Sequence, residues 1–143
     1  MSARLDPGMV GPTLRSWQLR CVLALACCVT AAATVLWTEP NAFALVLLAL
    51  VAVATVVRPD SHAATFYLGL TAFLVLVNEP GMSWWAAPAV LGIHATHTLA
   101  ALAAVVPWDT AVERAALRPS VRRFVAVQAA SQSLVLLALA VTP

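Results

Sequence analysis

Five apolar stretches, separated by short polar segments, make up most of the chain. They cover about residues 21–37, 42–57, 63–77, 84–106 and 124–142. A helix that crosses a bilayer needs about 20 mostly apolar residues, with a lower limit near about 17. The pattern therefore predicts an all-α polytopic membrane protein, a bundle of five short transmembrane helices. Because the first three stretches lie at the lower limit, four spans are the alternative.

Proline and glycine mark the places where the chain leaves these stretches. The segment before the first stretch contains two prolines and two glycines without apolar periodicity, which predicts a disordered cytoplasmic tail over residues 1–18. Residues 19–143 then form the bundle. A residue that precedes proline is disfavoured in the helical conformation, and such steps occur in three connections, at Glu39-Pro40, Arg58-Pro59 and Glu79-Pro80.

The charged residues are distributed unevenly between alternate connections. With the N-terminus inside the cell, all eight basic residues, which are arginines, fall in cytoplasmic segments, and the external connections carry only Glu39 and Glu79. Positively charged residues of membrane proteins are enriched on the cytoplasmic side. The N-terminus is therefore predicted to lie in the cytoplasm and the C-terminus outside the cell. Tryptophan rings prefer the membrane boundaries, and all five fall there, Trp17 and Trp108 inside and Trp37, Trp84 and Trp85 outside.

The composition favours a membrane protein over a soluble one. The 143 residues are 62% hydrophobic and 10% charged, with a mean hydropathy of +0.92, whereas about a quarter of the residues in soluble domains are charged. No arginine cluster is interleaved with aromatic residues, which argues against nucleic-acid binding. We expect a multi-pass protein of a bacterial plasma membrane that contacts the lipid bilayer and other membrane protein subunits.

Two histidines fall in the middle of the fourth stretch. His94 and His97 lie three residues apart on one side of the expected helix, and Gln128, Ser131 and Gln132 form a polar stripe at a similar depth in the fifth stretch. Ionisable groups at this depth usually face the protein interior or a water-filled cavity. We therefore predict that the two stripes meet in an intramembrane polar cluster.

Three interpretations of this cluster are open. Neutral histidines and glutamines can hydrogen-bond across a helix interface, at about 0.6–2 kcal/mol per contact. A proton or ion relay is the second, because the pKa of histidine lies near about 6.5; no intramembrane Asp or Glu accompanies the pair. A metal site is the third, and its third ligand would have to come from Cys27, Cys28 or Tyr67.

Small residues recur at every fourth position in two of the stretches. They are Gly92, Thr96, Ala100 and Ala104 in the fourth stretch and Ala24, Cys28 and Ala32 in the first. Ridges of small residues let membrane helices approach one another closely. Both ridges are therefore predicted to be packing faces.

The polar segment after Pro107 has a pattern of its own. Thr110 and Glu113 have the spacing of a capping box, which predicts a short amphipathic helix that ends at Pro119 and lies on the inner leaflet. Four arginines in and after this helix are predicted to face anionic lipid headgroups or a protein partner. They are Arg114, Arg118, Arg122 and Arg123.

Three short motifs in this sequence are similar to those of a known group of proteins. They are Arg58-Pro59-Asp60-Ser61-His62-Ala63, Glu79-Pro80-Gly81-Met82-Ser83-Trp84, and His94 before an Ala-Leu-rich stretch that ends at Pro107. They resemble a group of small integral membrane proteins of high-GC Gram-positive bacteria, which tend to be encoded near a MoxR-type AAA ATPase and von Willebrand factor A-related proteins. The resemblance implies a subunit of a membrane-associated assembly and assigns no catalytic residue.

Enzyme motifs are missing from the sequence. It contains no phosphate-binding glycine loop, nucleophile elbow or zinc-protease motif, so we expect no enzymatic activity and no cofactor. The leading hypothesis is a non-enzymatic integral membrane subunit or interaction protein of a larger membrane assembly. The alternative is a small transporter or proton- or ion-conducting protein that uses His94 and His97.

Overall fold

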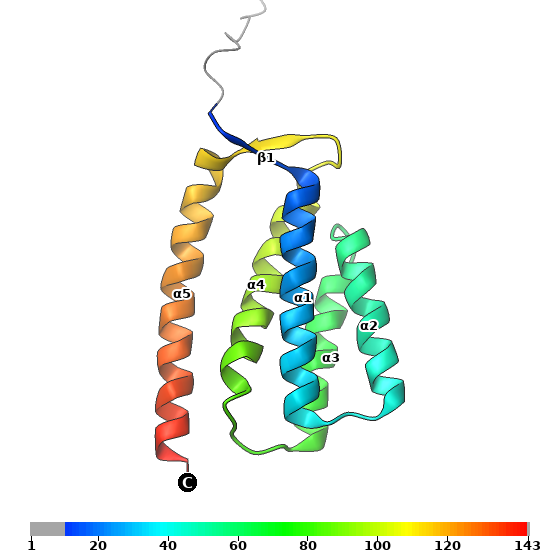
Figure 1. Cartoon of the computed structure of the whole chain (residues 1–143), viewed down its shortest axis with the longest axis vertical. Helices are drawn as coiled ribbons and strands as arrows, with labels where there is room; N and C mark the ends of the chain where they lie inside the picture. The colour runs from blue at the N-terminus through cyan, green and yellow to red at the C-terminus, as the bar shows by residue number, and fades with distance from the viewer. Residues whose placement is uncertain (1–10, 143) are drawn as a thin grey trace, which may run out of the picture.

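The computed structural model describes residues 11–142, which form five helices and two short strands (Figure 1). The predicted all-helical fold is confirmed. Successive helices run in opposite directions, and the strands lie across one end of the bundle (Figure 1). In chain order the elements are β1 (Thr13–Arg15), α1 (Ser16–Thr38), α2 (Ala42–Val57), α3 (Ala63–Asn78), α4 (Ala86–Ala104), β2 (Ala111–Glu113) and α5 (Arg114–Val141).

Three of the helices, α1, α4 and α5, are long and apolar enough to cross a membrane. The helices α2 and α3 are apolar but have only 16 residues each, about 24 Å at about 1.5 Å per residue, against a hydrocarbon core of about 30 Å. Large apolar side chains cover the outer surface, among them Phe43, 77% exposed, and Leu76, 72% exposed. A surface of this kind suits contact with lipid or with another apolar protein surface.

The two strands show that part of the predicted disordered tail is ordered. Residues 1–10 lie outside the described residues, but Thr13–Arg15 pairs antiparallel with Ala111–Glu113, and α1 begins at Ser16. The prediction of disorder is therefore wrong for residues 13–18. The pairing ties the start of α1 to the start of α5, and a three-residue strand whose partner lies far along the chain leaves no periodic pattern in the sequence.

The segment between α4 and α5 also differs from its prediction. Glu113 ends β2 and is the N-cap residue of α5, but its side chain makes no capping hydrogen bond. The Thr110 hydroxyl donates a hydrogen bond to the Pro107 carbonyl at 2.8 Å instead of capping a helix. The helix α5 starts at Arg114 and continues through Pro119. Pro119 lies in the second turn, where proline removes one helical hydrogen bond and its ring crowds the carbonyl four residues earlier, and the prediction that the helix ends there is wrong.

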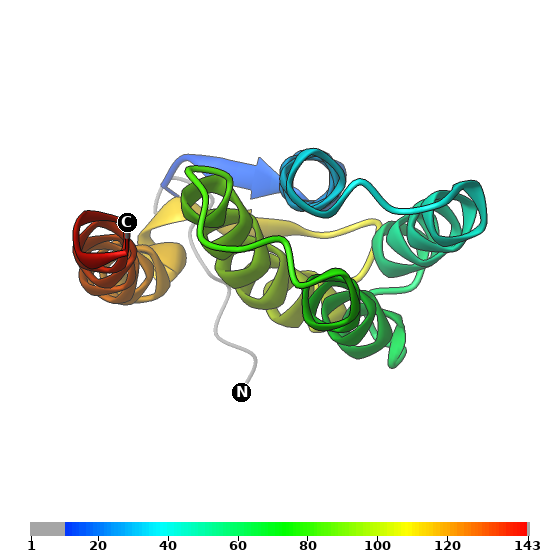
Figure 2. The same cartoon turned by 90° about the horizontal axis from the view of Figure 1, so that it is seen from below.

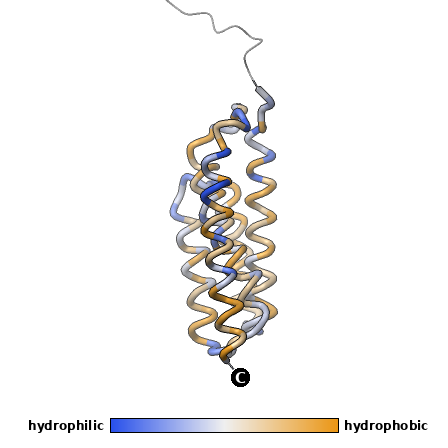
Figure 3. Tube along the Cα trace, turned by 90° about the vertical axis from the view of Figure 1, so that its left-hand side faces the viewer, coloured by the Kyte–Doolittle hydropathy of each residue, from blue (hydrophilic) through white to orange (hydrophobic). Residues whose placement is uncertain are grey.

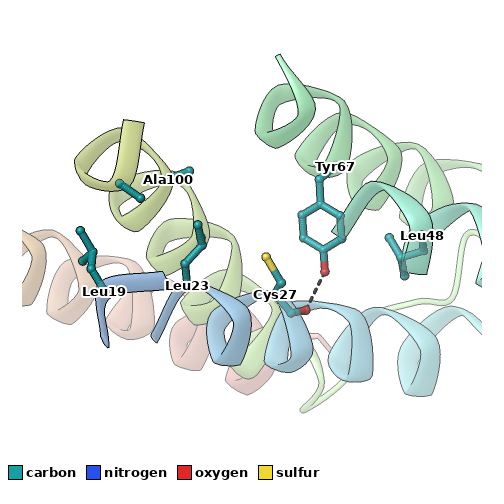
Figure 4. Packing of buried hydrophobic residues seen from close by; sticks show 7 residues of the cluster. Leu19, Leu23, Cys27, Leu48, Tyr67 and Ala100 are labelled. Atoms are coloured by element: carbon teal, nitrogen blue, oxygen red, sulfur yellow. Dashed lines mark hydrogen bonds between the residues drawn. The ribbon is translucent and has the colours of Figure 1, made fainter. Parts of the chain in front are cut away.

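The hydrophobic core lies where α1 packs against α2, α3 and α4, and α1 lies on one side of these helices when the bundle is seen end-on (Figure 2). Tyr67 of α3 is fully buried, and its hydroxyl donates a hydrogen bond of 2.7 Å to the Cys27 carbonyl of α1 (Figure 4). The aromatic ring thus fills the space between α1 and α3 while its polar tip is satisfied. The buried cluster consists of Leu19, Leu23, Cys27, Leu48, Tyr67, Ala100 and Ala103.

The helices α1 and α4 approach most closely at Gly92. A Cβ atom added there would lie 2.8 Å from the Thr30 backbone nitrogen and 2.9 Å from the Thr30 Cα atom. Beside it, the hydroxyls of Thr30 and Thr96 lie 3.3 Å apart. Gly92, Thr96 and Ala100 are buried, so three members of the predicted α4 ridge are packing residues, whereas Ala104 is exposed.

The ridge predicted on α1 is wrong. Cys28 and Ala32 are exposed, and the neighbouring Ala26, Cys27 and Thr30 are buried instead. A repeat of four residues occurs frequently by chance in an alanine-rich helix, and here the true packing face lies one to two positions away. Cys28 is therefore not a packing residue within this chain.

The described arginines lie toward one end of the bundle, which we call the arginine-rich end. It carries the two strands and the α2–α3 turn, and hydrophilic segments are concentrated there (Figure 3). Glu39 and Glu79 lie at the opposite end, where each follows a helix with a positive φ, of 46° and 41° respectively. There the Trp37 indole N–H also donates to the Gly81 carbonyl at 2.9 Å.

Candidate functional site

A seam of polar contacts joins α5 to α4. The Nδ1 atom of His94 and the Oε1 atom of Gln128 lie 3.0 Å apart, and Gln128 is buried. An amide oxygen can only accept a hydrogen bond, so the proton of this bond resides on His94 Nδ1. In the neutral ring, the Nε2 atom is then an acceptor.

The seam continues toward the opposite end of the bundle. The Gln132 side-chain amide donates a hydrogen bond of 2.9 Å to the Ala87 carbonyl of α4. The Gln128 amide nitrogen is buried and has no hydrogen-bond partner among residues 11–142. The predicted meeting of the two stripes therefore occurs through His94 and Gln128, while Gln132 contacts the α4 backbone instead of a histidine.

Two members of the predicted cluster do not join these contacts. His97 is exposed and Ser131 is partly exposed, and within the described part of the chain neither forms a side-chain hydrogen bond. Successive helical residues are rotated by about 100°, so His97 is displaced by about 60° from His94 around α4. This rotation turns His97 away from Gln128.

His97 instead lines a groove on the α4–α5 surface. The groove has a volume of about 480 Å³ and brings His97 together with Arg123 of α5. The Phe124 ring forms one wall and stacks on His94, with ring centroids 4.6 Å apart. The groove thus combines one guanidinium, two imidazoles and the Ser120 hydroxyl, and its other lining residues are Thr98, Ala101, Leu102 and Val127.

The four arginines predicted to face lipid or a partner are all exposed. Arg114, Arg118 and Arg122 are spaced at four residues and therefore follow one side of α5. Arg123 points into the polar groove described above. The predicted basic residues therefore divide into a surface row and a groove residue.

Sequence reasoning missed Arg20, which is only 6% exposed. Its guanidinium lies over the Trp108 ring at 3.7 Å, and its Nη1 atom donates to the Val56 carbonyl at 3.4 Å. The sequence does contain a pattern that indicates burial of Arg20, because Arg20 is three residues before Leu23 and seven before Cys27. These helical spacings place it on the core face of α1.

A third feature is an apolar groove of about 360 Å³ bounded by α1, α4 and α5. Leu25 and Val29 of α1 face Val121 and Phe124 of α5 across it, and Ala95 of α4 lies between them. Figure 1 shows α5 standing apart from α1 on this side.

No family model, curated protein or solved structure matches this chain. The resemblance to the membrane proteins encoded near MoxR-type ATPases therefore stays a prediction. Within residues 11–142, no group of three or more histidine, cysteine or acidic side chains is placed to hold a metal ion, and Tyr67 is engaged with the Cys27 carbonyl.

Proposed function

We propose that this chain is a non-enzymatic subunit of a larger assembly in a bacterial plasma membrane. It crosses the bilayer five times, and the bilayer thins locally around the 16-residue helices α2 and α3, since short spans are accommodated in this way at modest cost. The resemblance noted above supports a role as one subunit among several.

The proposed orientation places the N-terminus in the cytoplasm and the C-terminus outside. Its support is the arginine-rich end, which would face the cytoplasm, with Glu39 and Glu79 at the external end. The exposed Trp17 and Trp108 would then lie at the inner headgroup boundary. A C-terminal reporter detected on the cytoplasmic side would contradict this orientation.

The incomplete packing of α5 carries the proposal of a subunit. In its most apolar 18-residue window only 11% of the residues are buried, against 44% in α1. Gln128 and Val135 are its only buried residues in the described range, and its main helical contacts are with α4 (Figures 1 and 2). A membrane helix held along one seam leaves most of its surface for other helices.

The apolar groove between α1 and α5 is the proposed docking site, and its occupant is a transmembrane helix of another membrane protein. Ala26 and Ala95 line it, and small residues permit close approach of a helix backbone. A helix in this position would contact α1 and α5 together. The inner end of such a contact lies beside the exposed arginines of α5, which suit a partner with acidic residues at its cytoplasmic end.

Extraction of the assembly from its own membrane with a native-membrane polymer, followed by mass measurement, tests this proposal. We expect a particle heavier than one chain, and we expect Ala95→Leu to reduce it to the monomer because the larger side chain fills the groove. The matched control is Ala49→Leu, at an exposed position of α2 away from the groove, which should leave the mass unchanged. A wild-type chain found only as a free monomer would contradict the proposal.

The second candidate function is a proton or ion relay. The observation that favours it is the polar groove, where His97 and Arg123 lie beside the His94–Gln128 pair. In the proposed orientation this groove lies toward the cytoplasmic side, so protons would pass from it to His94. A neutral imidazole with one donor and one acceptor can transfer a proton between two partners.

The double variant His94→Gln/His97→Gln separates the two functions. Glutamine retains hydrogen-bonding capacity, so a packing role should tolerate it, whereas a relay should lose its pH-driven proton flux into liposomes. The variant His62→Gln, in the exposed α2–α3 turn, serves as the matched control. If flux through the double variant equals that of the wild type, the relay is excluded.

A further inference from the structure

A small cavity opens at the arginine-rich end of the bundle. It lies between α1, the α2–α3 turn and the C-terminal end of α4, and its volume is about 220 Å³. Of the described residues that line it, two carry a charge, Arg20 and Asp60. The remaining lining residues are apolar or aromatic, and Trp108 is among them.

Arg20 supplies a buried cation to one side of this cavity. Its Nε atom is buried and has no hydrogen-bond partner among residues 11–142, and no carboxylate in that range pairs with it. The long bond to the Val56 carbonyl and the Trp108 ring are its polar contacts. A buried guanidinium without an anion is costly, so Arg20 retains capacity to donate to an anionic oxygen from outside the chain.

The other side of the cavity favours a cation. Asp60 is exposed and presents a carboxylate. The C-terminal residues of α2 and α4 also line the cavity, and at a helix C-terminus the last carbonyl groups lack helical partners and the macrodipole is negative. A purely anionic ligand on Arg20 would therefore face negative charge across the cavity.

We infer that this cavity binds the headgroup of a phospholipid that carries both a phosphate and a primary ammonium group. The phosphate accepts hydrogen bonds from Arg20, and the ammonium donates to Asp60 and to carbonyl groups at the α4 C-terminus. Trp108, which is 61% exposed beside Arg20, is of the type that lies at headgroup level. Pockets between membrane helices at that level do bind lipid headgroups.

The inference rests on the membrane location proposed above but not on assembly with other proteins. It distinguishes three headgroups by their chemistry. A glycerol headgroup has the phosphate without a cation, and a choline headgroup has a quaternary ammonium that cannot donate a hydrogen bond. Only an ethanolamine-type headgroup offers both an acceptor for Arg20 and an N–H donor for Asp60.

Lipid retention in native mass spectrometry tests the inference. The full chain is placed in nanodiscs with equal amounts of dioleoyl phosphatidylethanolamine, phosphatidylglycerol and phosphatidylcholine and is then released into the gas phase. We expect the wild type to retain phosphatidylethanolamine about tenfold over each other lipid, the ratio given by the lower end of the contribution of one charge-assisted hydrogen bond. Asp60→Asn should abolish this preference, and Arg20→Gln should abolish retention of all three lipids.

Matched controls are Asp109→Asn and Arg118→Gln, both exposed and outside the cavity, and both should retain the wild-type preference. Because Asp60 is exposed, its variant keeps the test decisive even if the Arg20 variant does not fold.

Equal retention of the three lipids, a preference for phosphatidylglycerol, or an unchanged preference in Asp60→Asn would each overturn the inference. Displacement of the lipid by millimolar glycerophosphoethanolamine would show that a soluble headgroup suffices and would overturn the lipid as ligand. A chain that assembles with partners yet shows no lipid preference would leave the proposed function standing.

Discussion

Replacing Gly92 by alanine is expected to destabilise the folded protein by about 3 kcal/mol, the upper range for overpacking a well-packed interior. The added Cβ atom would lie 2.8 Å from the backbone nitrogen and 2.9 Å from the Cα atom of Thr30. These are backbone atoms of α1, so no side-chain rotation can relieve the contact. The helices α1 and α4 must separate, and the contact between the Thr30 and Thr96 hydroxyls is lost with them.

Gly69→Ala provides the matched control. A Cβ atom at Gly69 would meet nothing within 4 Å, and alanine in a helix interior is favoured over glycine by about 0.5–1 kcal/mol. The same substitution is therefore expected to destabilise the protein at position 92 and to stabilise it at position 69. Unfolding of the purified chain in mixed micelles by sodium dodecyl sulfate, followed by circular dichroism, measures both. Equal midpoints for the two variants would contradict the close approach of α1 and α4.

The small residues of α4 could be predicted from the sequence, but their partners on α1 could not. The reason lies in the threonines of α1. Thr30 and Thr34 are fully buried, and each hydroxyl donates to the carbonyl four residues earlier, at 2.8 Å. A threonine that satisfies its hydroxyl within its own helix packs as a small apolar residue. Ala26, Thr30 and Thr34 therefore form a second small-residue ridge with the same four-residue spacing as the predicted one, and the spacing alone does not decide which ridge packs.

The candidate site could also be predicted only in part from the sequence. Counting residues along the fourth and fifth stretches predicted that the two polar stripes meet, and they meet through one pair, His94 and Gln128. The rotation of α4 against α5 depends on which side chains interdigitate, and this decides that His97 faces the groove with Arg123. Arg20 was assigned to the inner boundary by its charge alone, whereas its spacing to Leu23 and Cys27 indicated burial.

Truncation of Tyr67 to alanine is expected to destabilise the fold by about 3 kcal/mol, because removal of a buried aromatic ring leaves a cavity that its neighbours fill only partly. Tyr67 is fully buried, and its ring separates the backbones of α1 and α3 near Cys27 (Figure 4). Of the three buried residues of α3, Tyr67 is the largest, and the other two are Thr71 and Leu74. The Tyr67 ring is therefore the largest buried side chain that α3 contributes to its packing.

Tyr67→Phe separates the contribution of the ring from that of the hydroxyl. It removes the 2.7 Å hydrogen bond to the Cys27 carbonyl and keeps the ring volume, so a loss of about 1 kcal/mol is expected for one buried hydrogen bond. The same detergent titration gives both values. If Tyr67→Phe costs as much as Tyr67→Ala, the hydrogen bond and not the ring holds α3 against α1. The larger loss in Tyr67→Ala is expected because the Cys27 carbonyl keeps its helical partner in α1, while the space left by the ring has no other side chain to fill it.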